Sequence, residues 1–328
     1  MTGPQLVIMG NLTTDNVVTA EGECLPQTFG GNCLYSALGA RVWSERVGVV
    51  SRYGLGYSEE PFERLRSLGV DTSGIRALDA PHGRNVAFAY RADGSRTRAF
   101  PPEVIARIPA AERARFIDTS LLSDADERWR QFAPDGEDVP PDWWSTVVAV
   151  HCAMMPVSKH LQIAATVRAK RDVAVWLQID SPWHDHRAPE VGHATNLFRQ
   201  IDAVLPSEAD VEAYRPGEPV EETVRAMLDD GAKMVVLKMG PAGCSIFERG
   251  RGLIAEIPVV PVIARDPTGA GDAFCGGFLA GMQISGEVAT AARYGAVSAS
   301  FAVEAPGLAG LIKCSRPEAN DRLESIMD

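Results

Sequence analysis

The 328-residue sequence lacks several patterns that define common protein classes. It has no Gly-x-x-x-x-Gly-Lys-Ser/Thr motif and no Gly-x-Gly-x-x-Gly after its first apolar run, which argues against a P-loop NTPase and a dinucleotide-binding domain. It contains no Gly-x-Ser-x-Gly nucleophile elbow of a hydrolase. Because no apolar run reaches about 18 residues, no membrane span is predicted. The start of the chain lacks the blocks of a signal peptide, and we expect a cytoplasmic protein.

Positive charge and paired cysteines are also scarce. The 32 Lys and Arg residues are outnumbered by 43 Asp and Glu residues, which gives a formal net charge of −11. The sequence therefore lacks the positive field that nucleic acid or an anionic membrane surface would require, and we expect neither as a partner. The six cysteines form no Cys-x-x-Cys pair, which is typical of reduced, packed thiols rather than of disulfides or a zinc site.

The chain instead alternates between apolar strand-like runs and helix-like runs. The predicted strands cover residues 5–9, 46–51, 146–151, 173–179, 203–205 and 234–238, followed by a strand-like run over 257–263. The predicted helices cover residues 32–43, 59–68, 158–170, 189–199, 219–229, 273–282 and 291–302. This alternation predicts a mostly parallel sheet covered by helices on both faces, with ligands at the carboxyl ends of the strands.

Further strand-like segments lie outside that alternation, at 14–19, 85–91 and 96–100, with Asp93-Gly94-Ser95 as a turn. They predict a small β sheet that either closes over the site as a lid or is a surface hairpin. Arg84, Arg96 and Arg98 belong to this region, where they either meet a phosphate or acidic substrate or remain solvated. Residues 101–145 fit neither pattern and are expected to form an irregular insert.

The most informative run is Asp266-Pro267-Thr268-Gly269-Ala270-Gly271-Asp272, which directly precedes a predicted helix. A helix N-terminus beneath the glycines offers backbone N–H groups and a dipole that favour a transferring phosphate. Asp272 is placed to accept the proton of an attacking hydroxyl. The alternative is a glycine-rich turn capped by two aspartates.

With Ala273-Phe274 and Gly276-Gly277-Phe278, this run resembles the C-terminal signature of the ribokinase-like, or PfkB, carbohydrate kinases. The N-terminal half is similar to that family too, because a strand over 7–11 leads to Asp15 and Phe29-Gly30-Gly31 leads into a helix. The resemblance implies one kinase domain over residues 1–328, with a three-layer α/β/α fold and a β lid at approximately 12–30 and 83–101. It implies ATP- and Mg²⁺-dependent phosphorylation of a hydroxyl of a sugar or related small polyol.

The resemblance also assigns roles to the residues of the signature. Asp272 would be the catalytic base, and the amides of Gly269, Ala270 and Gly271 would stabilise charge in the transition state. The substrate would be bound by Asp15, Gly30, Gly31, Tyr35 and Asp266. Asp15 is otherwise a turn or edge-strand residue, and the paired glycines are otherwise a strand-to-helix turn.

The sequence departs from its relatives at three positions. Tyr35 stands where many of them have a substrate-binding asparagine, so it either contacts the substrate or packs in the core. Ser207 and Asp210 replace an Asn-x-x-Glu motif and either meet the nucleotide and bind Mg²⁺ through water, or cap a helix. Lys238 either binds nucleotide phosphates or reaches solvent.

The nucleotide side would be completed by Gly240, Gly243 and Thr268, with adenine beside the helix over 291–302. Relatives can hold K⁺ near Pro306-Gly307 and the strand before Asp266, and a homodimer through the lid is a further expectation. Two other functions remain open, a nucleoside kinase of the same fold and a non-catalytic sugar or nucleotide sensor. Retention of both Asp15 and Asp272 argues against the sensor.

Overall fold

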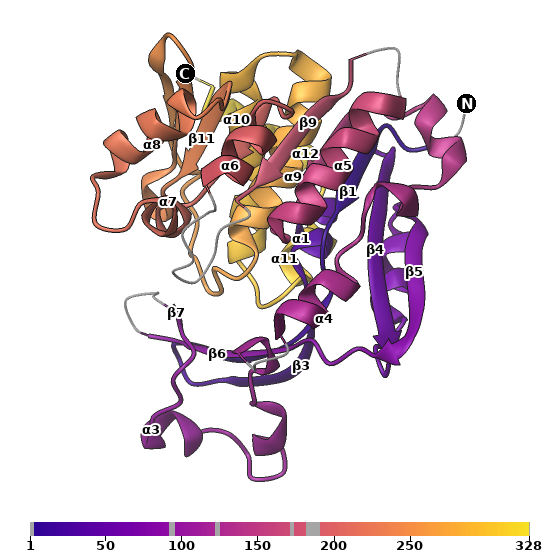
Figure 1. The fold of residues 1–328 in the computed structure, drawn as a ribbon. Coiled ribbons are helices and arrows are strands. Elements are labelled where there is room, and N and C mark those ends of the chain that lie inside the picture. Colours follow the sequence, from indigo (N-terminus) through magenta and orange to yellow (C-terminus); the bar gives the residue numbers. More distant parts are fainter. Residues whose placement is uncertain (1–2, 92–95, 122–124, 171–173, 182–190, 328) are drawn as a thin grey trace.

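A sheet of nine strands forms the centre of the protein (Figure 1). The computed structural model describes residues 3–91, 96–121, 125–170, 174–181 and 191–327. In spatial order the strands are β13 (Gly252–Ile257), β12 (Cys244–Glu248), β11 (Met234–Lys238), β10 (Ala203–Leu205), β9 (Trp176–Asp180), β8 (Ala149–Cys152), β1 (Leu6–Met9), β4 (Val47–Leu55) and β5 (Asp71–Pro81). The strands from β11 to β5 pair in parallel, whereas β12 and β13 form an antiparallel edge.

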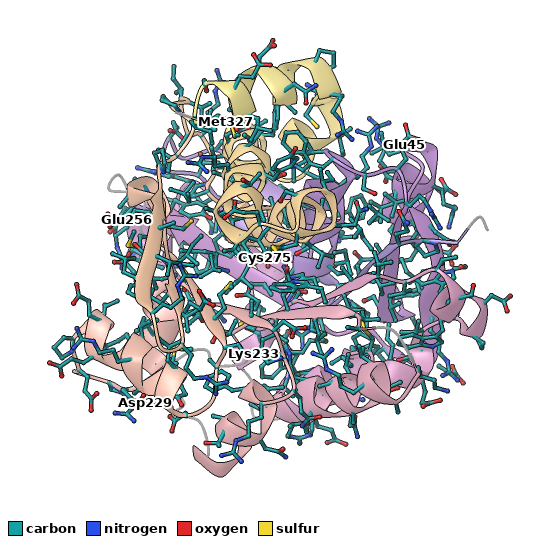
Figure 2. All side chains as sticks on the ribbon, turned by 90° about the horizontal axis from the view of Figure 1, so that it is seen from above. Glu45, Asp229, Lys233, Glu256, Cys275 and Met327 are labelled. Carbon is teal, nitrogen blue, oxygen red and sulfur yellow. The ribbon has the colours of Figure 1, made fainter. Side chains whose placement is uncertain are left out.

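Helices cover both faces of this sheet, as seen from above in Figure 2. One face carries α5 (Val157–Lys170), α6 (Val191–Phe198), α7 (Glu208–Tyr214) and α8 (Val220–Asp229). The other face carries α1 (Asn32–Arg41), α2 (Glu60–Ser67), α9 (Ala270–Ser285), α10 (Val288–Val303), α11 (Ala309–Lys313) and α12 (Arg316–Glu324). The predicted three-layer architecture is therefore confirmed.

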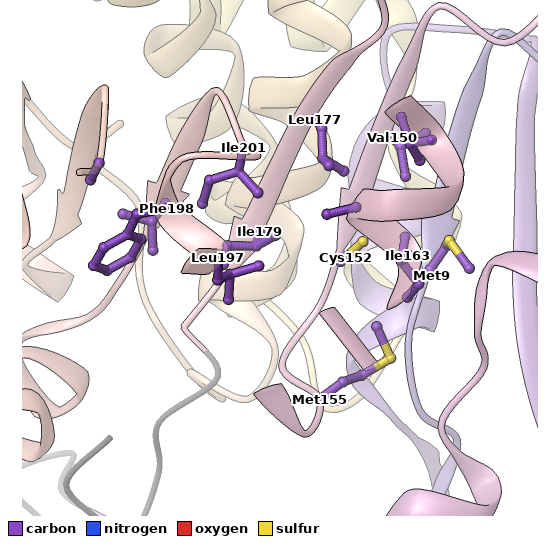
Figure 3. Close-up of a cluster of buried hydrophobic side chains, with 14 of the residues drawn as sticks. Met9, Val150, Cys152, Met155, Ile163, Leu177, Ile179, Leu197, Phe198 and Ile201 are labelled. Atoms are coloured by element: carbon purple, nitrogen blue, oxygen red, sulfur yellow. The ribbon is translucent and has the colours of Figure 1, made fainter. Parts of the chain in front are cut away.

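The side chains of β1 pack alternately into the cores on the two faces of the sheet. Val7 and Met9 point into the core beneath α5 and α6, where Figure 3 shows Met9 near Ile163. Leu6 and Ile8 belong to the opposite core, which is formed with α1, α9 and α10. Successive side chains of a strand alternate between the faces of a sheet, so a strand buried on both faces must be apolar throughout.

A second, four-stranded sheet lies below the large one in Figure 1, on the side where β1 and β4 end. Its strands are β3 (Cys24–Gly30), β2 (Thr13–Val18), β6 (Asn85–Tyr90) and β7 (Arg96–Thr97), in that order. We call it the small sheet. The turn predicted at Asp93-Gly94-Ser95 lies outside the described residues.

Two segments differ from the sequence-based expectation. The apolar run over 257–263 was predicted as a strand, but β13 ends at Ile257 and the rest has no regular structure, because Pro258 and Pro261 cannot donate backbone hydrogen bonds. Residues 101–145 contain α3 (Pro102–Ile105), α4 (Ala125–Phe132) and short 3₁₀ turns. Phe132 and Trp143 of this insert are buried in the core.

Candidate active site

Two cavities flank the segment that begins α9. The first, of about 430 Å³, is rich in polar groups and is lined by Asn11, Asp15, Gly31, Tyr35, Arg84, Arg98, Arg128, Trp129, Thr268, Gly269 and Asp272, among others. The second, of about 310 Å³, is mainly apolar and is lined by Lys238, Gly240, Gly243, Val260, Ala270, Gly271, Ala296 and Ala299, among others. We call them the polar cavity and the apolar cavity. Pro267 lines both, so the cavities adjoin at the start of α9.

The first turn of α9 leaves an anion-binding terminus between the cavities. Gly269 precedes the helix with a φ of 73°, a left-handed conformation that glycine adopts without strain, and no described side chain caps this terminus. A Cβ at Gly269 would also overlap the ring of Tyr35. The amide of Ala270 donates to the carbonyl oxygen of Pro267 at 3.2 Å, so this N–H group is already hydrogen-bonded within the turn. Asp272 lies in the first turn and faces the polar cavity.

Asp266, which the resemblance assigned to the substrate, lines neither cavity. Its buried carboxylate accepts hydrogen bonds from the amide of Thr268 at 2.9 Å, from the Thr268 hydroxyl at 2.5 Å and from the amide of Gly307 at 3.0 Å. Asp266 thus fixes the loop before α9 and ties it to the turn after α10. A carboxylate that accepts several hydrogen bonds in this way orders the backbone around it.

Thr268 was assigned to the nucleotide, but the structure places it on the polar cavity. Its hydroxyl lies 2.6 Å from the hydroxyl of Tyr90, which belongs to β6 of the small sheet. The small sheet therefore contacts the glycine loop of α9. Contact between these two segments closes one side of the polar cavity.

Asp15 reaches the polar cavity from β2. It is 7% exposed and accepts a hydrogen bond from the Thr13 hydroxyl at 2.6 Å. Gly30 lies behind this carboxylate, where any Cβ would overlap the Asp15 oxygens, so Gly30 supports Asp15 rather than lining the cavity. Gly31 does line the cavity, with a φ of 113° and close contact to the backbone of Asn11.

Tyr35 combines both of its predicted alternatives. Its ring is 3% exposed, packs against Gly269 and still lines the polar cavity. Burial, followed by the nearby charges of Asp15 and Asp266, raises the pKa of the phenol well above its usual value. Tyr35 is therefore an uncharged part of the cavity wall beside the N-terminus of α9.

Lys238 is buried rather than directed to solvent. Its side chain is 11% exposed, and Nζ donates to Asp180 Oδ1 at 2.9 Å. Burial alone would lower the pKa of Lys238, but the acidic groups around it, Asp180 first among them, together raise it. A Cβ built on Gly271 would lie 3.4 Å from Nζ, which places the ammonium beside the first turn of α9.

Ser207 and Asp210 form a reciprocal cap of α7 and line neither cavity. Asp210 Oδ2 accepts from the Ser207 amide at 2.8 Å and from its hydroxyl at 2.6 Å, while Ser207 Oγ accepts from the Asp210 amide at 3.3 Å. Burial and the charge of Asp180 raise the pKa of Asp210 to about 6. In the described part of the chain, no group of three His, Cys, Asp or Glu residues could hold a metal by itself.

Sequence reasoning missed the contributions of Asn11, Arg128 and Trp129 to the polar cavity. Asn11 is buried; its amide nitrogen donates to the carbonyl oxygen of Met154, and its Oδ1 has no donor among the described residues. Arg128 and Trp129 come from α4, in the insert with no recognisable pattern. No local signal marks them, because only the tertiary fold brings α4 to the cavity.

No helix in the described ranges is long and apolar enough to cross a membrane.

The model of the pfkB family carbohydrate kinases matches residues 148–313. A cytidine kinase from Thermococcus kodakarensis is 23% identical over 276 residues, which cover 84% of this chain and 87% of that protein. A 5-dehydro-2-deoxygluconokinase from Bacillus velezensis is 30% identical over 155 residues, which cover 46% of this chain and 47% of that protein.

Among solved structures, the ribokinase of Arabidopsis thaliana in complex with ribose and ATP has a TM-score of 0.68 at 20% identity, covering 98% of this chain and 99% of that one. At this identity the likeness establishes the fold, which agrees with the sequence-based prediction. The family match spans just over half of the chain and includes the glycine loop and Asp272. The chain therefore belongs to the pfkB family of carbohydrate kinases.

Proposed function

We propose that this kinase transfers the γ-phosphoryl group of ATP to a hydroxyl of a small polyhydroxylated molecule bound in the polar cavity. The observation that carries the proposal is the junction of the two cavities at the N-terminus of α9, with Asp272 on the polar side. A nucleotide in the apolar cavity would direct its phosphates toward the uncapped helix N-terminus, where N–H groups and the helix dipole favour negative charge.

In the proposed reaction, Asp272 accepts the proton of the attacking hydroxyl. The hydroxyl oxygen forms a bond to the γ-phosphorus while the bond from that phosphorus to the bridging oxygen of ADP breaks. The amide of Gly271 and the buried ammonium of Lys238 stabilise the charge that develops on the transferred group. The contact of Tyr90 with Thr268 supports a further role for the small sheet, which would exclude water as a competing acceptor.

We propose Mg²⁺ as the metal, bound through water by Asp210 with Asp180 beside it. The donor set fits, because both groups are carboxylates. Burial and the charge of Asp180 raise the pKa of Asp210, and the positive charge of a nearby cation would oppose this shift. Bound Mg²⁺ would neutralise phosphate charge. A K⁺ site near Gly307 also remains a proposal, and unchanged activity after replacement of K⁺ by a large organic cation would refute it.

The substrate class is a sugar or a related polyol, for which Asp15 can accept hydrogen bonds from neighbouring hydroxyls. Trp129 favours a second candidate, a nucleoside, because an indole on the cavity wall can stack on a base. The similarity to a cytidine kinase over 84% of the chain supports this alternative as well. We further propose that the enzyme acts in the cytoplasm, where its six unpaired cysteines would remain reduced, and that a homodimer forms through the small sheet.

A panel of sugars, polyols, sugar acids and nucleosides, scored for ATP-dependent release of ADP with Mg²⁺, tests the proposed function. A product phosphorylated on a hydroxyl, formed by the natural chain and not by Asp272→Asn, would support it. Binding of ATP and panel members without turnover under any metal condition would instead favour the non-catalytic sensor.

A further inference from the structure

Three arginines, Arg84, Arg98 and Arg128, line the polar cavity. Arg98 donates from Nη1 to Asp118 Oδ2 at 3.0 Å and to the Ser120 hydroxyl at 2.7 Å. The side chain of Asp118 is 5% exposed and that of Arg98 is 26% exposed, so this ion pair is partly buried. Arg98 is therefore already matched by a carboxylate that the chain provides.

Among the described residues, no carboxylate forms such an ion pair with Arg84. It lies between β5 and β6, is half-buried, and lines the polar cavity. Its Nε is buried and has no hydrogen-bond acceptor among the described residues. A guanidinium N–H buried without an acceptor is unfavourable, and it is rare unless water, an ion or a ligand completes the site.

Arg128 adds a second positive charge beside Arg84. A Cβ built on Gly83, the residue before Arg84, would lie 3.5 Å from Arg128 Nη1. Burial, followed by the charge of Arg128, lowers the pKa of Arg84 to about 10, although Asp15 and Asp118 act in the opposite direction. Two neighbouring guanidinium groups on a cavity wall supply the positive charge and the N–H donors that bind a carboxylate or phosphate.

We propose that the substrate carries an anionic group, a carboxylate or a phosphate, that is bound by Arg84 and Arg128. This inference rests on the proposed function and narrows its substrate class. Asp15 and Asp272 line the same cavity as the two arginines, so one small molecule can present hydroxyls to the carboxylates and an anion to the guanidiniums. A sugar acid or a sugar phosphate has both features, whereas a free sugar or nucleoside lacks the anion.

Matched ligand pairs test the proposal. Gluconate is compared with glucitol, and fructose 6-phosphate with fructose, in ATP-dependent turnover and in calorimetric binding without turnover. Loss of a hydrogen bond to a charged group predicts that Arg84→Gln weakens binding of the preferred anion by about 10- to 100-fold and leaves its neutral partner unchanged. Arg84→Lys should restore part of the preference, and Arg251→Gln, on the exposed turn after β12, should match the natural chain.

The outcomes separate this inference from the proposed function. Preference for one anion of a pair, lost in Arg84→Gln, supports the inference and shows whether a carboxylate or a phosphate is recognised. Turnover of neutral ligands at least as fast as anions, unaffected by Arg84→Gln, overturns the inference while supporting the kinase. Anion binding that depends on Arg84 without any turnover supports the anion site and counts against the kinase. Retained binding of an ATP analogue shows that each variant is folded.

Discussion

Replacement of Asp272 by Asn tests the chemical core of the proposed reaction. The variant keeps the size of the side chain and its place in the first turn of α9 but removes its basicity. General base catalysis contributes about 10²- to 10⁴-fold, so we expect kcat to fall by that factor, which corresponds to about 2.7 to 5.4 kcal/mol of activation free energy. The folded state should lose at most about 2 kcal/mol, the upper contribution of a charged side chain at a partly buried helix N-terminus.

Release of ADP at saturating substrate measures kcat, and titration with an ATP analogue measures nucleotide binding. Asp272 lines the polar cavity and not the apolar one, so nucleotide affinity should change less than threefold, an expectation of about 0.6 kcal/mol or less at RT ≈ 0.59 kcal/mol. Asp229→Asn is the matched control, since Asp229 is exposed at the end of α8, at the edge of the molecule in Figure 2, and lines neither cavity. A kcat within a factor of a few of the natural chain would refute the assignment of Asp272 as the base.

Three further perturbations follow from the contacts around the cavities. Lys238→Met leaves Asp180 buried without its cation, so we expect a loss of about 3 to 5 kcal/mol in the free energy of unfolding, measured by urea denaturation, together with weaker ATP binding. Gly30→Ala would displace the Asp15 carboxylate, so kcat/KM for the substrate should fall at least about tenfold, as expected when a hydrogen bond to a charged group is removed. Binding of an ATP analogue should persist. The folded-state pKa of Asp210 is raised from 3.8 to about 6, so its ionisation opposes folding. The free energy of unfolding of the natural chain relative to Asp210→Asn should therefore decrease as pH rises from about 4 to about 6, and urea titrations across that range would contradict the pKa shift if they showed no change.

The sequence was most informative where one local segment builds both structure and chemistry. The run from Asp266 to Asp272 contains the turn, the helix N-terminus and the carboxylate within seven residues, so its placement needed no tertiary information. Even there the helix was predicted to begin at Ala273, because the glycines before it have low helix propensity. In the structure it begins at Ala270. The helix begins early because Gly269 provides the left-handed residue that precedes it.

Predictions were weaker where a residue has different roles in different tertiary surroundings. The apolar run over 257–263 has the composition of a buried strand, yet its side chains form a wall of the apolar cavity. Both environments select apolar residues, and only the prolines distinguish them. Lys238 likewise had two possible positions until its partner was known, and Asp180 lies 58 residues away in the chain.

Tyr35, which departs from the family pattern, and the insert residues Arg128 and Trp129 all line the polar cavity. Tyr35 places a neutral ring against Gly269 of the glycine loop and forms part of the wall of the polar cavity. The insert then adds Arg128 and Trp129 to the cavity from α4, where they supply positive charge and an aromatic surface. We therefore expect a cavity with Tyr35 in place of an amide and with Arg84 and Arg128 in its wall to select against the neutral sugars that an amide would bind. The residues that prevented a substrate assignment from sequence are therefore the residues that we expect to set the substrate preference.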